Sequence, residues 1–140
     1  MITKERSSTI CWMALVAILL AKPAIAAWDP ARYEGENTLQ FLTVGPDEGE
    51  HWSTVWLVVI DDQVYIRLGS RAATRIQGNT RAPIVSIRVG GEEFADVEAM
   101  DAREMTEKVA AAMAEKYWSD VLVRYFSHPL TIKLRPKQAP

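Results

Sequence analysis

The sequence predicts an α+β domain, a small antiparallel barrel of about six strands with one longer helix and one or two short helices. A first strand-like segment is followed by two consecutive hairpins, which supply four more strands. A helical segment and one closing strand come after them. The strand count and the hydrophobicity of the predicted sheet favour a barrel.

The first 26 residues have the pattern of a signal peptide. Lys4 and Arg6 give a basic start, residues 10–21 form an apolar run, Pro23 breaks it, and 24–26 read Ala-Ile-Ala, the small-residue cleavage signature. We expect cleavage after Ala26 and a periplasmic or secreted protein. An uncleaved membrane anchor is the alternative, but this run is shorter than the roughly 20 residues that cross a bilayer. We therefore expect no stable membrane insertion after cleavage.

The composition of the remaining chain limits its chemistry. The one cysteine, Cys11, lies in the leader, so the mature protein has no disulfide, thiol nucleophile or cysteine-ligated zinc. From Ala27 onward, 13 basic and 17 acidic residues argue against nucleic acid as a partner. About 114 residues suffice for one domain: we expect an N-terminal segment at 27–37, the barrel domain at 38–136 and a tail at 137–140.

Apolar patterns bounded by turn formers predict the strands. Most of them alternate, whereas residues 55–60 are apolar on both faces, as a buried central strand requires. In the third strand, Val64, Ile66 and Leu68 should face the core, with Tyr65 and Arg67 on the opposite face. Glycines 90 and 91 should make a two-residue hairpin turn, since both readily take positive φ. The predicted strands are 39–44, 52–60, 64–68, 84–89, 92–99 and 130–135.

Helical spacing predicts the remaining elements. A short helix is expected at 72–77, ended by Gly78. Asp101 with Glu104 resembles a capping pair. The longer helix that follows has an apolar stripe at helical spacing and runs to Trp118. A second short helix should begin at Ser119. The expected stripe of the longer helix is Met105, Val109, Ala112, Met113 and Tyr117.

A block of arginines is the strongest candidate for a ligand site. Between Asp62 and Glu92 the chain carries five arginines with no lysine and no acid. A turn with free N–H groups, a hydroxyl and guanidinium donors suits a phosphate or carboxylate. Equally, these arginines could pair across the sheet with the acidic stretch at 92–107. The five are Arg67, Arg71, Arg75, Arg81 and Arg88.

Other chemistry has weaker support. His51 and His128 lie in turns without metal-ligand spacing, so no metal site is expected. No P-loop, Gly-x-Ser-x-Gly or Gly-x-Gly-x-x-Gly motif occurs. Among the aromatic residues, Trp52, Tyr65 and Trp118 are candidates for stacking on a planar ligand, while most others should belong to the core.

The segment 53–60 (Ser-Thr-Val-Trp-Leu-Val-Val-Ile), the hairpin into 64–67 and the sequence Gly-Ser-Arg-Ala-Ala at 69–73 resemble the FMN-binding split β-barrel proteins. This group contains the pyridoxamine-phosphate oxidases and the deazaflavin-dependent nitroreductase relatives. The resemblance spans about 39–135 and implies a split barrel, a homodimer, and FMN or deazaflavin bound at the subunit interface.

By that resemblance, Arg67, Ser70 and Arg71 would hold the cofactor phosphate and Arg75 would follow on the short helix. Ser53 and Thr54 would approach the ring from the neighbouring strand. The chain would then bind a phosphorylated small molecule and possess oxidoreductase activity. The alternative is a cofactor-free periplasmic binding or interaction module that uses the arginine-rich face.

Overall fold

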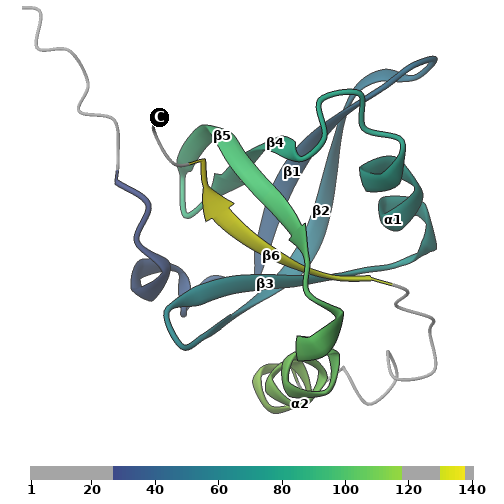
Figure 1. Ribbon diagram of the computed structural model, residues 1–140. Coiled ribbons are helices and arrows are strands. Elements are labelled where there is room, and N and C mark those ends of the chain that lie inside the picture. Colours follow the sequence, from purple (N-terminus) through teal and green to yellow (C-terminus); the bar gives the residue numbers. More distant parts are fainter. Residues whose placement is uncertain (1–26, 118–129, 138–140) are drawn as a thin grey trace, which may run out of the picture.

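The computed structural model describes residues 27–117 and 130–137. They form a closed antiparallel barrel with strand order β1-β2-β3-β6-β5-β4 (Figure 1), which confirms the predicted fold class. No helix in the described ranges is long and apolar enough to cross a membrane. The elements are η1 (Pro30–Tyr33), β1 (Thr38–Gly45), β2 (Gly49–Ile60), β3 (Gln63–Leu68), α1 (Ser70–Gln77), β4 (Ile84–Val89), β5 (Glu92–Asp101), η2 (Arg103–Met105), α2 (Thr106–Lys116) and β6 (Leu130–Pro136).

Tight turns connect the hairpins, and their residues explain the strand lengths. β2 begins three residues before the predicted position, because the β1–β2 turn uses only residues 46–48 and Gly49 takes a φ of 73°. The β2–β3 turn places Asp61 and Asp62 at φ 49° and 61°, a region that aspartate tolerates better than most residues. Gly90 and Gly91, at φ 57° and 78°, form the predicted turn between β4 and β5.

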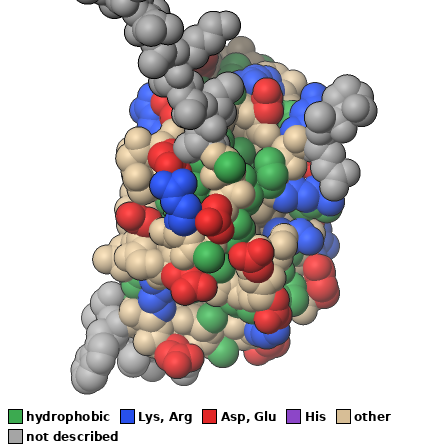
Figure 2. All heavy atoms as spheres, turned by 90° about the vertical axis from the view of Figure 1, so that its left-hand side faces the viewer, with side chains coloured by type: hydrophobic (Ala, Val, Ile, Leu, Met, Phe, Trp, Pro, Cys, Tyr) green, Lys and Arg blue, Asp and Glu red, His purple; other side chains and the backbone are tan. Residues whose placement is uncertain are grey.

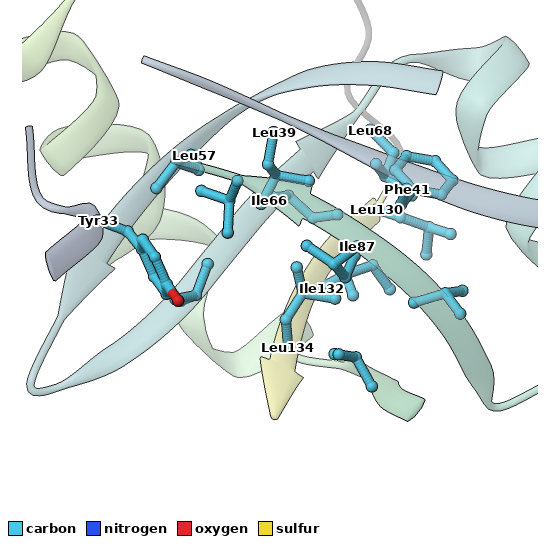
Figure 3. Close-up of a cluster of buried hydrophobic side chains, with 14 of the residues drawn as sticks. Tyr33, Leu39, Phe41, Leu57, Ile66, Leu68, Ile87, Leu130, Ile132 and Leu134 are labelled. Atoms are coloured by element: carbon cyan, nitrogen blue, oxygen red, sulfur yellow. The ribbon is translucent and has the colours of Figure 1, made fainter. Parts of the chain in front are cut away.

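Apolar side chains from all six strands fill the inside of the barrel (Figure 3). Val64, Ile66 and Leu68 are buried there, as predicted. Phe41 and Ile87, on paired strands β1 and β4, face each other in the same core. Each such side chain contributes about 1.5–3 kcal/mol when it leaves water, so this cluster is the main source of the barrel's stability.

Helix α2 covers the outer face of β2 and β3 with three residues of the predicted stripe, Val109, Ala112 and Met113. The helix ends at Lys116, before the predicted end at Trp118, so Met105 and Tyr117 of the predicted stripe pack from either side of it. Tyr117 stacks on Trp56, with ring centroids 5.1 Å apart and planes 16° apart, and donates its hydroxyl towards the Leu57 carbonyl at 2.6 Å. The start of the helix differs from the prediction: Asp101 accepts a hydrogen bond from the Arg103 amide within η2, and α2 begins after it. The predicted short helix from Ser119 lies outside the described residues.

The N-terminal segment is fixed to β5. Tyr33 is buried and donates its hydroxyl to Glu92 Oε2 at 2.9 Å, while Arg32 pairs with Glu92 Oε1 at 2.7 Å. Burial, together with the bond to Glu92, raises the pKa of Tyr33 to about 12. Trp28 packs against Tyr33 and Phe94. This aromatic cluster packs against the core of the barrel.

Candidate functional site

Helix α1 begins directly after β3, and its first turn is suited to bind an anion. Gly69 is the N-cap and contributes no side-chain cap, and the first turn contains no acidic residue. The first intrahelical bond runs from the Ala73 amide to the Gly69 carbonyl. The amides of residues 70–72 therefore precede the hydrogen-bonded part of the helix and are available to a ligand, in the positive field of the helix dipole.

Arg67 lies on the outer face of β3, two residues before the cap of α1. It stands opposite Thr131 of β6 in the strand register. Its Nε atom is buried and has no hydrogen-bond partner within residues 27–117 and 130–137. A buried N–H without an acceptor is costly, and most such groups in proteins are satisfied. Arg67 is thus a donor for which the described residues provide no acceptor.

Ser70 and Arg71 form the first residues of α1, and both are exposed. The Ser70 carbonyl accepts a hydrogen bond from Thr74 Oγ1 at 2.9 Å. The Ser70 hydroxyl makes no hydrogen bond with any residue in 27–117 or 130–137. Arg71 makes no hydrogen bond or ion pair with any residue in 27–117 or 130–137. Three donor groups, Arg67, Ser70 and Arg71, therefore lie within five residues of chain around a helix N-terminus.

Arg75 is placed differently. Its Nη2 lies 2.8 Å from Glu48 Oε1 and its Nε lies 3.1 Å from Glu48 Oε2. This fork joins α1 to the β1–β2 turn, and it raises the pKa of Arg75 chiefly through the hydrogen bonds to Glu48. A ligand phosphate can use Arg75 only if the pair with Glu48 opens.

The rest of the arginine block divides between pairing and exposure. Arg88 on β4 bonds Glu93 on β5 at 2.8 Å, and its guanidinium lies 3.8 Å from the centroid of the Trp52 ring. It is the one member of the block that pairs with the acidic stretch within the described residues. Arg81 is exposed, and no acid in those ranges pairs with its side chain. The pairing interpretation thus holds for Arg88, and ligand binding stays a prediction for Arg67 and Arg71.

The two predicted site residues on β2, Ser53 and Thr54, point to opposite faces of the strand. Ser53 stands opposite Phe41 in the register, on the inner face, where its buried Oγ has no hydrogen-bond partner in the part of the chain that the structure describes. Thr54 lies on the outer face, exposed, and accepts a 3.4 Å hydrogen bond from Gln40. Since Arg67 also faces outward, Thr54 shares its face and Ser53 does not.

Asn79 is a positioning residue that the sequence interpretation did not identify. It is buried at 7% exposure, accepts hydrogen bonds from the Val44 and Arg81 amides, and donates to the Ile84 carbonyl. These bonds fix the connection from α1 to β4. In the sequence, the Gly-Asn pair after the helix indicated only that the helix ends there, and the hydrogen bonds of Asn79 could not be predicted from it.

Comparison with solved structures supports the fold. HutZ, the heme storage protein from Vibrio cholerae, aligns with a TM-score of 0.59 at 20% identity over 78% of this chain and 88% of that one. The conserved hypothetical protein Rv2991 from Mycobacterium tuberculosis gives 0.57 at 18% identity, over 84% and 85%. The F420-H2 dependent reductase FDR-A gives 0.54 at 14% identity, over 71% and 95%.

No protein-family model matches this chain, and no curated protein matches it in sequence. The likeness is therefore one of fold: this chain is a split β-barrel, as the sequence resemblance predicted.

Proposed function

We propose that this protein binds the phosphate of a flavin-type cofactor, FMN or a deazaflavin, at the N-terminus of α1. Arg67, Ser70 and Arg71 would hold the phosphate, together with the first-turn amides of the helix. The observation that carries the proposal is the buried Nε of Arg67, which has no partner among the described residues, beside a helix start that has no side-chain cap and no acid in its first turn. A phosphate would supply the acceptors that this group of donors lacks.

The residues present fit such a group. Guanidinium forks recognise phosphate oxygens through paired hydrogen bonds, and two arginines balance the charge of a phosphate monoester. Thr54 shares the outer face with Arg67 and would approach the ring from β2. Ser53 would reach a ligand only from the inside of the barrel, and Arg75 only after release from Glu48. When bound, a flavin-type cofactor supplies hydride or electron transfer, so oxidoreductase activity is part of the proposal.

Two structural neighbours support a cofactor-binding role, since one is a heme storage protein and another is an F420-H2 dependent reductase. Heme is the second candidate cofactor that these neighbours raise. His51 is the one histidine among the described residues, and its Nδ1 lies 3.4 Å from Glu48 Oε1. We favour the phosphorylated cofactor because the arginines and the first-turn amides of α1 suit a phosphate.

We also propose export and dimerisation. Removal of residues 1–26 would release a chain starting at Ala27, and intact mass of the secreted protein tests this. A homodimer would place the cofactor at a subunit interface, and light scattering with and without FMN tests it. A membrane-bound full-length chain would contradict the proposal of export. A protein that stays monomeric with and without FMN would contradict the proposal of dimerisation.

Titration of FMN and a deazaflavin into the purified protein, followed by fluorescence, tests the cofactor proposal. Arg71→Ala should weaken binding roughly ten- to a hundredfold, the effect of losing one charge-assisted hydrogen bond or two. Arg71→Lys should recover part of the loss, because a point charge does not reproduce the fork. The matched control is Arg81→Ala, which removes an equally exposed arginine outside the site and should change little.

Riboflavin lacks the phosphate and should bind weakly, with no dependence on Arg71. A parallel titration with hemin tests whether the protein binds heme, the second candidate cofactor. If the wild-type protein binds neither FMN nor a deazaflavin at micromolar concentration, the proposal fails. The arginine-rich face would then be better explained by a cofactor-free binding or interaction module.

A further inference from the structure

We infer that the protein has a second binding site, for a small aromatic carboxylate, in a groove at the end of the barrel opposite α1. The groove has a volume of about 430 Å³ and is formed where the N-terminal segment, the β2–β3 turn and the end of β6 meet. Pockets of a few hundred Å³ accommodate small organic ligands. The residues that matter are Trp28, Asp62, Gln63, Lys133 and Arg135.

The groove is separate from the phosphate site. Gln63 begins β3 at the groove and Leu68 ends it before α1. At about 3.3 Å per residue these two positions are roughly 17 Å apart, and Figure 1 shows the two ends of β3 on opposite sides of the barrel. The two sites therefore do not share a ligand of the size of a single ring and an acid group.

Two cationic side chains give the groove its preference for an anion. Lys133 stands opposite Tyr65 and Met100 in the strand register and makes no hydrogen bond or ion pair with any residue of the described ranges. Arg135 donates its Nε to Glu98 at 2.8 Å. The terminal nitrogens of Arg135, Nη1 and Nη2, have no partner among the described residues. Both cations can therefore donate to one carboxylate without giving up an existing ion pair.

Asp62 lies on another wall of the groove. Its exposed carboxylate disfavours an anion beside the β2–β3 turn. The acid group of the ligand should thus lie against β6, with the remainder directed away from it.

Trp28 supplies a surface for an aromatic ring. The centroid of its indole lies 5.1 Å from that of the Phe94 ring, with the ring planes 82° apart, and 5.6 Å from that of the Tyr33 ring, with the planes 59° apart. Neither neighbour stacks in parallel on the indole, yet both hold it in place. A ring that is already ordered costs little entropy when a ligand stacks on it.

The surroundings also favour a small ligand over a protein partner. Figure 2 shows this side of the molecule, on which acidic and basic side chains lie close together around limited apolar areas. Large protein interfaces have a core depleted of charge. A small molecule needs only the indole and the two cations.

The test uses 1-naphthoate as the probe and ¹⁵N-labelled protein. The indole N–H resonance of Trp28, assigned with Trp28→Phe or by backbone assignment if that variant unfolds, should shift on titration. Kd should be on the order of 1 mM or tighter for a ligand of this size. Lys133→Glu should weaken binding roughly tenfold or more. Lys137→Glu makes the same charge change at an exposed residue outside the groove and should leave binding unchanged.

Two further arms separate the sources of affinity. The neutral analogue 1-naphthalenemethanol should bind more weakly than 1-naphthoate, and Arg71→Ala should have no effect on either. An unshifted Trp28 resonance at saturating probe overturns the inference. So does an equal loss of affinity in Lys133→Glu and Lys137→Glu, which would indicate attraction to overall charge.

Discussion

Arg75 and Glu48 form a forked ion pair across 27 residues of sequence, with Nη2 2.8 Å from Oε1 and Nε within 3.2 Å of both carboxylate oxygens. The pair joins the C-terminal half of α1 to the β1–β2 turn. Because the phosphate donors lie at the other end of the same short helix, Arg75 has a structural partner where the sequence resemblance implied a cofactor contact.

Arg75→Gln is therefore expected to have little effect on FMN affinity compared with Arg71→Ala. Its melting temperature should fall by a few degrees at most, since exposed ion pairs contribute modestly. Glu48→Gln should give the same fall, and the double variant should add nothing further, as coupled partners do in a mutant cycle. Thermal unfolding followed by circular dichroism and FMN titration measure the two effects. A loss of FMN binding as large as that of Arg71→Ala would instead assign Arg75 to the phosphate.

The same pair predicts a pH dependence. The hydrogen bonds from Arg75 are the main reason that the pKa of Glu48 lies below its ordinary value of 4.5. An acid whose pKa is lower in the folded than in the unfolded protein stabilises the folded state at pH values above its unfolded pKa. This contribution is lost as pH falls through the pKa of the folded protein. The difference in melting temperature between wild type and Glu48→Gln should be present near neutral pH and shrink in acid below about pH 4. A difference that stays constant with pH contradicts this assignment.

The sequence predicted the barrel well because its signals were local. Alternation or, in β2, a continuous apolar run identified the strands, and the Gly90–Gly91 turn fixed the register that places Arg88 opposite Glu93. That ion pair was accordingly foreseeable. The stripe on α2 was equally visible, since helical spacing alone defines it.

The site could be predicted only in part, because its decisive contacts join distant segments. Nothing in the sequence indicates that Arg75 meets Glu48 instead of an acid after β4. Alternation placed Arg67 on the outer face, but not the burial of its Nε. Likewise Trp28 and Lys133 lie 105 positions apart in the sequence, and only the closure of the barrel brings them to one groove.

Tyr33 should titrate later than an exposed tyrosine. Burial first, and then its bond to Glu92, raise the pKa of Tyr33 from 10.0 to about 12. A raised pKa means that the stabilising contribution is complete below about pH 10 and is lost as pH rises towards the folded value. Absorbance titration at alkaline pH should show a late step that Tyr33→Phe lacks. An unchanged late step in Tyr33→Phe would show that another tyrosine is responsible.

We expect Arg67 to contribute to phosphate binding while it lowers the stability of the cofactor-free protein. Its buried Nε has no partner in the described structure, and an unsatisfied buried donor destabilises a protein. Arg67→Met keeps a long side chain and removes the donor, so the cofactor-free protein should become more stable, by up to about 1 kcal/mol in urea unfolding. The same change should weaken FMN binding roughly tenfold or more.

The matched control is Arg81→Met, the same substitution at an exposed arginine, which should alter neither quantity. Adding FMN should stabilise wild type and leave Arg67→Met nearly unaffected, because a ligand stabilises only a protein that binds it. If Arg67→Met instead loses stability without cofactor, Arg67 has a structural role across the sheet and its Nε is not reserved for a phosphate. FMN affinity would then have to depend on Ser70, Arg71 and the first turn of α1 alone.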